Sequence, residues 1–524
     1  MWRGSHFRIG GSGISFAAAR RLVRPPILRL AVPRLAIYPV LVTLAFALND
    51  YAASNVSLEA LPRPLVVAAV ATIAVQLVLS AILRDRDRAA YLTLMIQFAL
   101  FGLAVVSLIL AIWLLAAVVV AFRRRRGLRL IPWLRATRVL NAVAILMLVQ
   151  VVATSWLNGA LIFGRSTWSV PRGQAASDAP DVYLIMLDGY PRADTLATSY
   201  DYDNQPWLSS MERLGFSVAT RSHSNYDVTV LTLASMFNGA QIPTLIPSPP
   251  DSRAAQFRAL TRIINQGTDL QRFRHAGYEI VSVPSEYFEG TVVDADRNLD
   301  TGELSSFEMQ LLQTGAMTTA FGDLEKTWLP NEHRQRIFRE FDTLLGLASE
   351  RGRGPKIVFS HFLAPHMPIS FNADGSAAKG LSCFPRRCNL FTYGDGYGSE
   401  VIGPLRDQIT WLNGKVEETV RAIQDRSATP PVIVIFSDHG TRFWSDNRPE
   451  MFHSLLLAAT PGHPGLFPDD ASPVNLLSRL LNAYTTIQVP LSSEEDYWLD
   501  TREVERKGLL GPLRAVTSED QLEG

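Results

Sequence analysis

Long stretches without a charged side chain dominate the first 164 residues and set the strongest limit on the fold. These stretches are residues 35–48, 64–83, 89–122 and 139–164. A helix needs about 20 apolar residues to cross the ~30 Å hydrocarbon core of a bilayer. We therefore expect residues 1–164 to form a transmembrane helical bundle of about five spans, near 31–49, 64–83, 89–104, 106–122 and 139–158.

Arginine clusters between these stretches orient the bundle. They lie at positions 3, 8, 20, 21, 24, 29 and 34, then at 84, 86 and 88, then at 123–126, 129, 135 and 138. Only Arg63 lies between the first two spans. If every cluster is cytoplasmic, the stretch 89–122 crosses twice, with a tight turn near Gly102. The chain after Gly164 is then extracytoplasmic. One long helix over 89–122 is the alternative, and it would place that part in the cytoplasm.

The overall composition excludes two classes of protein. The chain has 50 Lys and Arg against 49 Asp and Glu, so its formal net charge of +1 gives no basic surface for nucleic acid. Two cysteines in 524 residues exclude a disulfide-dense scaffold and a cysteine-based metal cluster.

The chain after the linker at 165–180 alternates between strand and helix patterns. Short apolar runs at 181–187, 278–283, 356–362, 431–436 and 453–459 predict buried strands. Helical patterns lie at 207–214, 231–237 and 408–422. We therefore expect an α/β domain with a mainly parallel central sheet over 181–500, followed by a charged tail over 501–524.

Polar residues that follow these strands are the candidate ligands of a divalent metal. Asp188 follows the first strand, and Asp438 and His439 follow the strand at 431–436. Ligands in parallel α/β folds bind at the carboxyl ends of the strands. Two carboxylates and an imidazole suit Zn²⁺ or Mn²⁺, and Mg²⁺ or Ca²⁺ would also accept the carboxylates.

A hydroxyl at the start of a helix is the candidate nucleophile. Asn225 and Asp227 favour a helix start, and Thr229 falls in its first turn. A hydroxyl there meets free backbone N–H groups, which favour an anionic phosphoryl or sulfuryl group. From spacing alone, Thr229 could equally cap or pack the helix.

These motifs together resemble the alkaline phosphatase superfamily. The strand ending in Asp188, the helix opening at Thr229 and the Ser-Asp-His-Gly turn at 437–440 are similar to its membrane-anchored sulfatase-like branch, which contains lipoteichoic acid synthases and phosphoethanolamine transferases. The resemblance implies an alkaline-phosphatase-like fold. It implies Asp188, Thr229, Asp438 and His439 as ligands of one metal ion, with Thr229 also the nucleophile.

The resemblance further implies a cell-envelope enzyme in a bacterial inner (plasma) membrane, with its catalytic domain in the periplasm or outside the cell. We expect a transferase that moves a phosphoryl-linked headgroup, of phosphoethanolamine or phosphoglycerol type, through a phospho-threonine intermediate. The donor would be a membrane phospholipid and the acceptor an envelope glycan or lipid. The alternatives are a phosphodiesterase or sulfatase of the same superfamily and a catalytically dead membrane scaffold.

Other polar residues are weaker candidates for the site. In the family, a Pro-His-x-Pro segment faces the substrate, so His366 is assigned to binding a phosphoryl oxygen or protonating the leaving group. The remaining substrate-binding candidates are Asn225, His361, Arg442 and His453, and each has a plain alternative as a cap, core or solvated residue.

The two cysteines allow two interpretations. Cys383 begins a Cys-x-Pro-x-Arg sequence, which also marks formylglycine sulfatases. In sulfatases that motif opens the nucleophile helix, a place that Thr229 already holds. We therefore expect a local disulfide between Cys383 and Cys388 in an extracytoplasmic domain.

Overall fold

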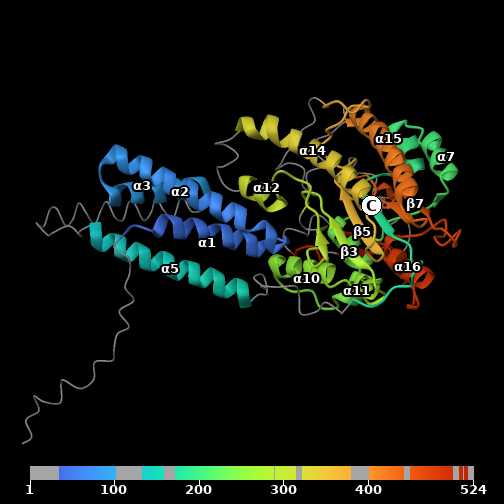
Figure 1. Ribbon diagram of the computed structural model, residues 1–524, viewed down its shortest axis with the longest axis horizontal. Helices are drawn as coiled ribbons and strands as arrows, with labels where there is room; N and C mark the ends of the chain where they lie inside the picture. Colours follow the sequence, from blue (N-terminus) through green and yellow to red (C-terminus); the bar gives the residue numbers. More distant parts are fainter. Residues whose placement is uncertain are drawn as a thin grey trace, which may run out of the picture.

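The computed structural model describes residues 35–101, 133–157, 172–287, 290–313, 322–378, 401–441, 449–499, 507–511 and 513–516. A group of long N-terminal helices lies at one end of the molecule, and an α/β domain lies at the other (Figure 1).

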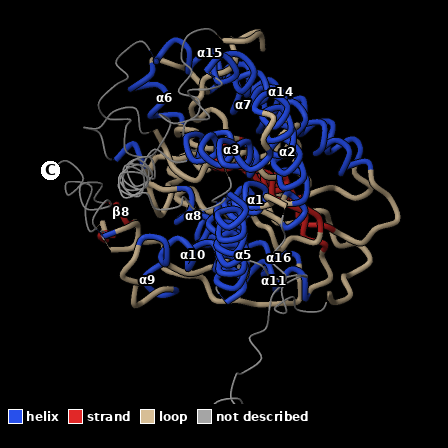
Figure 2. Tube along the Cα trace, turned by 90° about the vertical axis from the view of Figure 1, so that its left-hand side faces the viewer, coloured by secondary structure: helices blue, strands red, loops and turns tan. Residues whose placement is uncertain are grey.

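Four helices form the N-terminal part in the described residues, and they pack side by side (Figures 1 and 2). They are α1 (Tyr38–Ala53), α2 (Pro62–Leu83), α3 (Arg86–Phe101) and α5 (Trp133–Leu157). A polar cluster joins three of them, because Gln97 Nε2 donates to Thr43 Oγ1 at 2.6 Å and to Thr72 Oγ1 at 3.2 Å. Such buried hydrogen bonds hold helices together where no water competes.

Two of these helices are long and apolar enough to cross a membrane, over Leu58–Leu83 and Ala136–Leu157. Their apolar side chains face outward: Leu77 is 65% exposed and Leu146 68% exposed. A core helix of a soluble protein would bury such residues. The exposed apolar surface therefore favours contact with lipid.

The prediction of about five spans is only partly matched. The expected spans at 64–83 and 139–158 correspond to α2 and α5. Helices α1 and α3 have 16 residues each within the described part, or about 24 Å at 1.5 Å per residue. For α1 that length falls short of the ~30 Å core, whereas α3 reaches the end of the described residues at Phe101. The expected span at 106–122 and the turn near Gly102 lie outside the described residues.

The α/β domain is built on a seven-stranded sheet with the order β2-β7-β6-β1-β5-β3-β4. The strands are β1 (Val182–Leu187), β2 (Ser217–Val218), β3 (Glu279–Val283), β4 (Arg297–Asn298), β5 (Lys356–Phe362), β6 (Val432–Phe436) and β7 (Leu456–Ala459). β1 runs parallel to both neighbours, β5 and β6. β7 pairs antiparallel with β6, and β2 pairs antiparallel with β7. The sheet is mainly parallel, as predicted.

Helices cover both faces of this sheet (Figure 1). Alternate residues of β1 enter two separate cores, with Tyr183, Ile185 and Leu187 in one and Val182, Leu184 and Met186 in the other. The helices are α6 (Ala193–Tyr200), α7 (Gln205–Arg213), α8 (Thr229–Met236), α9 (Ile242–Leu245), α10 (Arg253–Asn265), α11 (Thr268–His275), α12 (Ser306–Gln313), α14 (Gly322–Ser349), α15 (Ile402–Arg426) and α16 (Leu476–Tyr484). A separate hairpin joins β8 (Tyr497–Leu499) and β9 (Leu513–Ala515).

The loop between α1 and α2 joins the two parts of the molecule. Asn55 Nδ2 donates to the carbonyl oxygen of Thr291 at 2.8 Å, and Asn55 Oδ1 accepts from Asn265 Nδ2 at 2.8 Å. Arg63 pairs with Glu308. The ring of Tyr51 packs edge-on against that of Phe307. The α/β domain is therefore fixed to the helical part by specific polar and aromatic contacts.

Candidate metal centre

Asp188, Asp438 and His439 meet at the carboxyl ends of two neighbouring strands. β1 and β6 are parallel, so the residues that follow them lie at the same edge of the sheet. One ligand atom from each of the three residues lies within 4.8 Å of the others, and all three residues are buried. His439 Nε2 lies 3.5 Å from Asp188 Oδ1 and 3.4 Å from Asp438 Oδ2. No second group of this kind occurs among the residues that the structure describes.

The hydrogen bonds around these residues leave atoms suited to a cation. His439 Nδ1 lies 2.7 Å from the Gly440 carbonyl oxygen, which can only accept, so Nδ1 carries the proton. The lone pair on Nε2 then faces the carboxylates. Asp188 Oδ1 is buried and has no hydrogen-bond partner in the described chain. Two carboxylates and a neutral imidazole make a donor set that fits Zn²⁺ or Mn²⁺.

His361 holds the other oxygen of Asp188. It lies opposite Met186 in the β1–β5 register, and its Nε2 donates to Asp188 Oδ2 at 2.9 Å. Ser285 Oγ lies 3.2 Å from His361 Nδ1. Burial alone would raise the pKa of Asp188, but the charge of His366 and the hydrogen bond from His361 hold it below the usual range. The Asp188 carboxyl is therefore ionised and oriented for a cation.

Gly189 makes room for two histidine rings beside the carboxylates. Its φ of +68° is in the left-handed region, where glycine carries no penalty. A Cβ there would lie 3.3 Å from His439 Cε1 and 3.7 Å from His366 Cδ2. The rings of His366 and His439 are 6.3 Å apart between centroids. The structure thus brings His366 next to the cluster of Asp188, Asp438 and His439.

Helix α8 begins at Thr229 and lies against the end of β6. Thr232 Oγ1 donates to the Asp438 carbonyl oxygen at 2.9 Å. Thr229 lies three residues earlier on the same helical face, at the end where backbone N–H groups lack helical partners. Thr229 is buried. The expected helix start is present, and Thr232 holds this helix against the backbone of Asp438.

Two of the weaker candidates have contacts of their own. Asn225 does not cap α8, whose N-cap is Val228. Its Oδ1 accepts from Val474 N at 2.9 Å and its Nδ2 donates to Glu495 O at 3.2 Å, so it ties distant segments together. His453 is half-buried, and its Nδ1 lies 3.3 Å from Thr195 Oγ1. Substrate binding by either residue stays a prediction.

Three predicted residues cannot be placed. Arg442, Cys383 and Cys388 lie outside the described residues, so the arginine contact and the disulfide stay predictions.

The sequence reasoning missed Ser285, which completes the chain of contacts to Asp188. It follows β3, whose carboxyl end lies at the same edge of the sheet as those of β1 and β5. The signal that could have found Ser285 is its position just after the predicted strand at 278–283, which is the same signal that indicates Asp188.

No protein-family model and no curated protein matches this sequence. Solved structures do match it. The C-terminal periplasmic domain of EcEptC from Escherichia coli has 10% identity and a TM-score of 0.41, covering 68% of this chain and 99% of that one. The integral membrane lipooligosaccharide phosphoethanolamine transferase A from Neisseria meningitidis has 13% identity and a TM-score of 0.39, covering 76% and 69%. The 2-O GAG sulfatase BT1596 has 13% identity and a TM-score of 0.38, covering 60% and 72%. The solved structures that this chain is similar to thus include phosphoethanolamine transferases and a sulfatase.

Proposed function

We propose that this chain is a metal-dependent transferase that moves a phosphoryl-linked headgroup from a membrane phospholipid to an extracytoplasmic acceptor. The observation that carries the proposal is the buried cluster of Asp188, Asp438 and His439, against which Thr232 holds helix α8, the helix that begins at Thr229. A hydroxyl next to such a cluster is the arrangement that group transfer through a covalent intermediate requires.

Asp188, Asp438, His439 and the Thr229 hydroxyl would hold the metal. When bound there, a divalent cation lowers the pKa of a hydroxyl and neutralises negative charge on a phosphoryl group. The free N–H groups at the start of α8 stabilise the same negative charge. His361 keeps Asp188 oriented throughout, because it bonds the oxygen that faces away from His439.

The transfer runs in two balanced steps. Thr229 Oγ1 attacks the donor phosphorus and forms a P–O bond, while the bond from phosphorus to diacylglycerol oxygen breaks. The leaving oxygen takes up one proton and the Thr229 hydroxyl loses one. In the second step an acceptor hydroxyl attacks the phosphorus of phospho-threonine and forms a P–O bond, while the bond from phosphorus to Thr229 Oγ1 breaks. The acceptor hydroxyl gives up its proton, and the Thr229 oxygen takes one up.

His366 is placed to bind a phosphoryl oxygen or to protonate the leaving group. Its Nδ1 donates to the Met367 carbonyl oxygen at 2.7 Å, which fixes the ring and leaves Nε2 as the second nitrogen. The side chain is half-buried and lies beside Gly189 at the metal centre. A group that is partly open to solvent and fixed in orientation suits proton transfer.

The contacts of the α1–α2 loop support an extracytoplasmic site. Asn55 of this loop and Arg63 of the first turn of α2 contact the α/β domain, so the loop and the domain lie on the same side of the membrane. If α2 crosses the bilayer, Arg84, Arg86 and Arg88 lie on the opposite side. The positive-inside rule places that arginine cluster in the cytoplasm. The domain then faces the periplasm or the cell exterior.

A hydrolase is the second candidate, since water could replace the acceptor hydroxyl at the same cluster. The observation that favours this candidate is the half-buried His366, which could also orient water. A dead scaffold would be marked by missing ligands, and Asp188, Asp438 and His439 are all present.

Peptide mass spectrometry of the full chain from its own membranes tests the proposal. We expect a phosphoryl-headgroup adduct on Thr229, whose mass identifies the group. Thr229→Val should abolish the adduct and the activity, and Thr229→Ser should keep a measurable part of both. Thr198→Val, at an exposed threonine of α6, is the matched control and should change neither.

Two results would contradict the transferase mechanism. Formylglycine at Cys383 with an unmodified Thr229 would make the chain a sulfatase. Full activity of Thr229→Val would exclude that hydroxyl as the nucleophile.

A further inference from the structure

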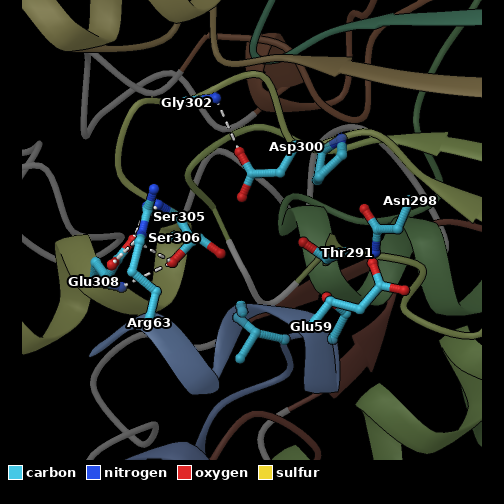
Figure 3. A pocket seen from close by; sticks show the side chains of 13 residues that line it. Glu59, Arg63, Thr291, Asn298, Asp300, Gly302, Ser305, Ser306 and Glu308 are labelled. Carbon is cyan, nitrogen blue, oxygen red and sulfur yellow. Dashed lines mark hydrogen bonds and ion pairs between the residues drawn. The ribbon is translucent and has the colours of Figure 1, made fainter. Parts of the chain in front are cut away.

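A pocket of about 300 Å³ lies where the α1–α2 loop meets the α/β domain (Figure 3). The N-terminal part contributes Glu59 of the α1–α2 loop and Arg63 of the first turn of α2, and the domain contributes Thr291, Asn298, Asp300 and Ser305. Neither part of the molecule forms this pocket alone. Its lining residues Pro284 and Asp300 follow β3 and β4 in the chain. The pocket therefore opens at the same edge of the sheet as the metal centre.

The pocket is nevertheless a separate site. None of Asp188, Thr229, Asp438 and His439 lines it. A short connection links the two: Pro284 lines the pocket, and the next residue, Ser285, contacts His361 at the metal centre. A molecule in the pocket would therefore lie near the reaction site without entering it.

One side of the pocket offers acceptors for a cation. Glu59, Thr291 and Asn298 lie together on that side, with Asp300 above them (Figure 3). Glu59 is exposed and forms no ion pair with any described residue. Thr291 is 5% exposed, and its Oγ1 has no hydrogen-bond partner in the described chain. A buried hydroxyl without a partner costs free energy, which a ligand in the pocket would recover.

The opposite side offers a donor for an anion. Arg63 lies there with Ser305 and Ser306 (Figure 3). Its guanidinium bonds Glu308 and the Glu303 carbonyl oxygen, which fixes its orientation. The side chain still keeps 57% of its surface exposed. Arginine held in this way is suited to a phosphate oxygen. The pocket thus has carboxylates on one side, where Asp300 is also paired with Arg336, and on the other side the guanidinium of Arg63, whose charge is shared with Glu308.

The pocket also lies at the edge of the apolar surface. Arg63 lies in the first turn of α2, and the outward-facing apolar side chains begin three residues later at Val66, which is 61% exposed. If α2 crosses the bilayer, this is the depth of the lipid headgroups. A lipid whose acyl chains lie along α2 could therefore place its headgroup in the pocket.

We propose that the junction pocket binds the zwitterionic headgroup of a membrane phospholipid, with its ammonium at Glu59, Asp300 and Thr291 and its phosphate at Arg63. The bound lipid is distinct from the one that reacts at Thr229. Only the expectation that this lipid lies beside a transferase site rests on the proposed function. The charge pattern favours a zwitterion over an anionic headgroup, because a headgroup without an ammonium leaves Glu59 unpaired.

Native mass spectrometry of the full chain in detergent tests this. The probes are phosphatidylethanolamine and phosphatidylglycerol with the same acyl chains, at equal concentration. We expect phosphatidylethanolamine to be retained about fivefold more, since about 1 kcal/mol of charge pairing corresponds to that ratio. Glu59→Gln and Thr291→Val should each bring the ratio towards one. Thr291→Val loses no described hydrogen bond of the Thr291 side chain. Glu212→Gln, at an exposed glutamate of α7, should leave the ratio unchanged.

Equal retention of the two lipids, or an unchanged ratio in Glu59→Gln, would overturn the proposal. Adding free ethanolamine distinguishes two sources of the ammonium group. If ethanolamine displaces the lipid, the pocket also binds a soluble amine. If it does not, the lipid is the ligand. Bound lipid dissociates on denaturation, whereas an adduct on Thr229 does not. Loss of the bound-lipid signal therefore leaves the proposed transferase function intact, and loss of the Thr229 adduct leaves the proposed lipid site intact.

Discussion

The hydrogen bond from His361 to Asp188 allows a sharp test of the metal centre. Both residues are buried, and His361 Nε2 donates to Asp188 Oδ2 at 2.9 Å. His361→Leu removes this donor at similar volume and leaves the carboxylate free to rotate away from His439. Loss of such an outer contact lowers metal affinity about 10–100-fold, or about 1.4–2.8 kcal/mol.

Zinc titration calorimetry of the purified full chain measures this change. His361→Gln keeps an N–H donor, so we expect it to lose less than tenfold. His453→Leu removes a histidine that contacts Thr195 instead, and its zinc affinity should stay within twofold of the wild type. Thermal unfolding without metal, for each variant, separates a loss of fold from a loss of ligand geometry.

One result would refute this reasoning. If His361→Leu binds zinc as tightly as the wild type while KM for the substrate rises, His361 acts on the substrate and not on Asp188. That outcome would support the role that the sequence alone assigns to it.

Three further predictions concern the described fold. Burial and the charge of Glu286 raise the pKa of Glu340 well above its usual value. The folded state therefore loses stability as pH rises above about 4.5. Glu340→Gln should unfold at a higher temperature than the wild type, and the difference should be larger at pH 8 than at pH 5. Asn55→Ala leaves the Thr291 carbonyl without that donor and should cost about 1–3 kcal/mol in denaturant unfolding. Gly189→Ala meets a positive φ and the His439 ring, so it should cost about 1–2 kcal/mol and weaken zinc binding in calorimetry.

Each has its own contrary result. A pH-independent shift for Glu340→Gln would mean that the carboxyl is already ionised in the fold. Unchanged stability of Asn55→Ala would mean that the loop contacts form only transiently. Wild-type zinc affinity in Gly189→Ala would mean that the backbone there can relax away from the ring.

The central strands and most of the metal cluster could be predicted because each depends on a local pattern. The run 356–362 corresponds to β5, and the run 431–436 to β6, because short runs that are mostly apolar are typical of a strand buried on both faces. Parallel strands bring their following residues to one edge, so Asp188, Asp438 and His439 met as expected.

What the sequence left out depends on contacts between distant segments. The direction of β7 could not be predicted, since an apolar run has the same pattern in either direction. The bond between His361 and Asp188 joins residues 173 positions apart, and neither neighbourhood identifies the other. The 16-residue helix α1 was predicted as a full span because an uncharged run does not mark where its helix begins or ends.

The contacts of the α1–α2 loop also bear on the order in which the protein assembles. During synthesis α1 and α2 emerge first, and the partners of Asn55 and Arg63 follow more than two hundred residues later. N-terminal segments generally fold first. The polar groups of the loop therefore stay hydrated until the α/β domain has been synthesised and has reached the same side of the membrane. A fragment that begins at the linker would fold without this surface, and its lipid binding would not represent that of the whole chain.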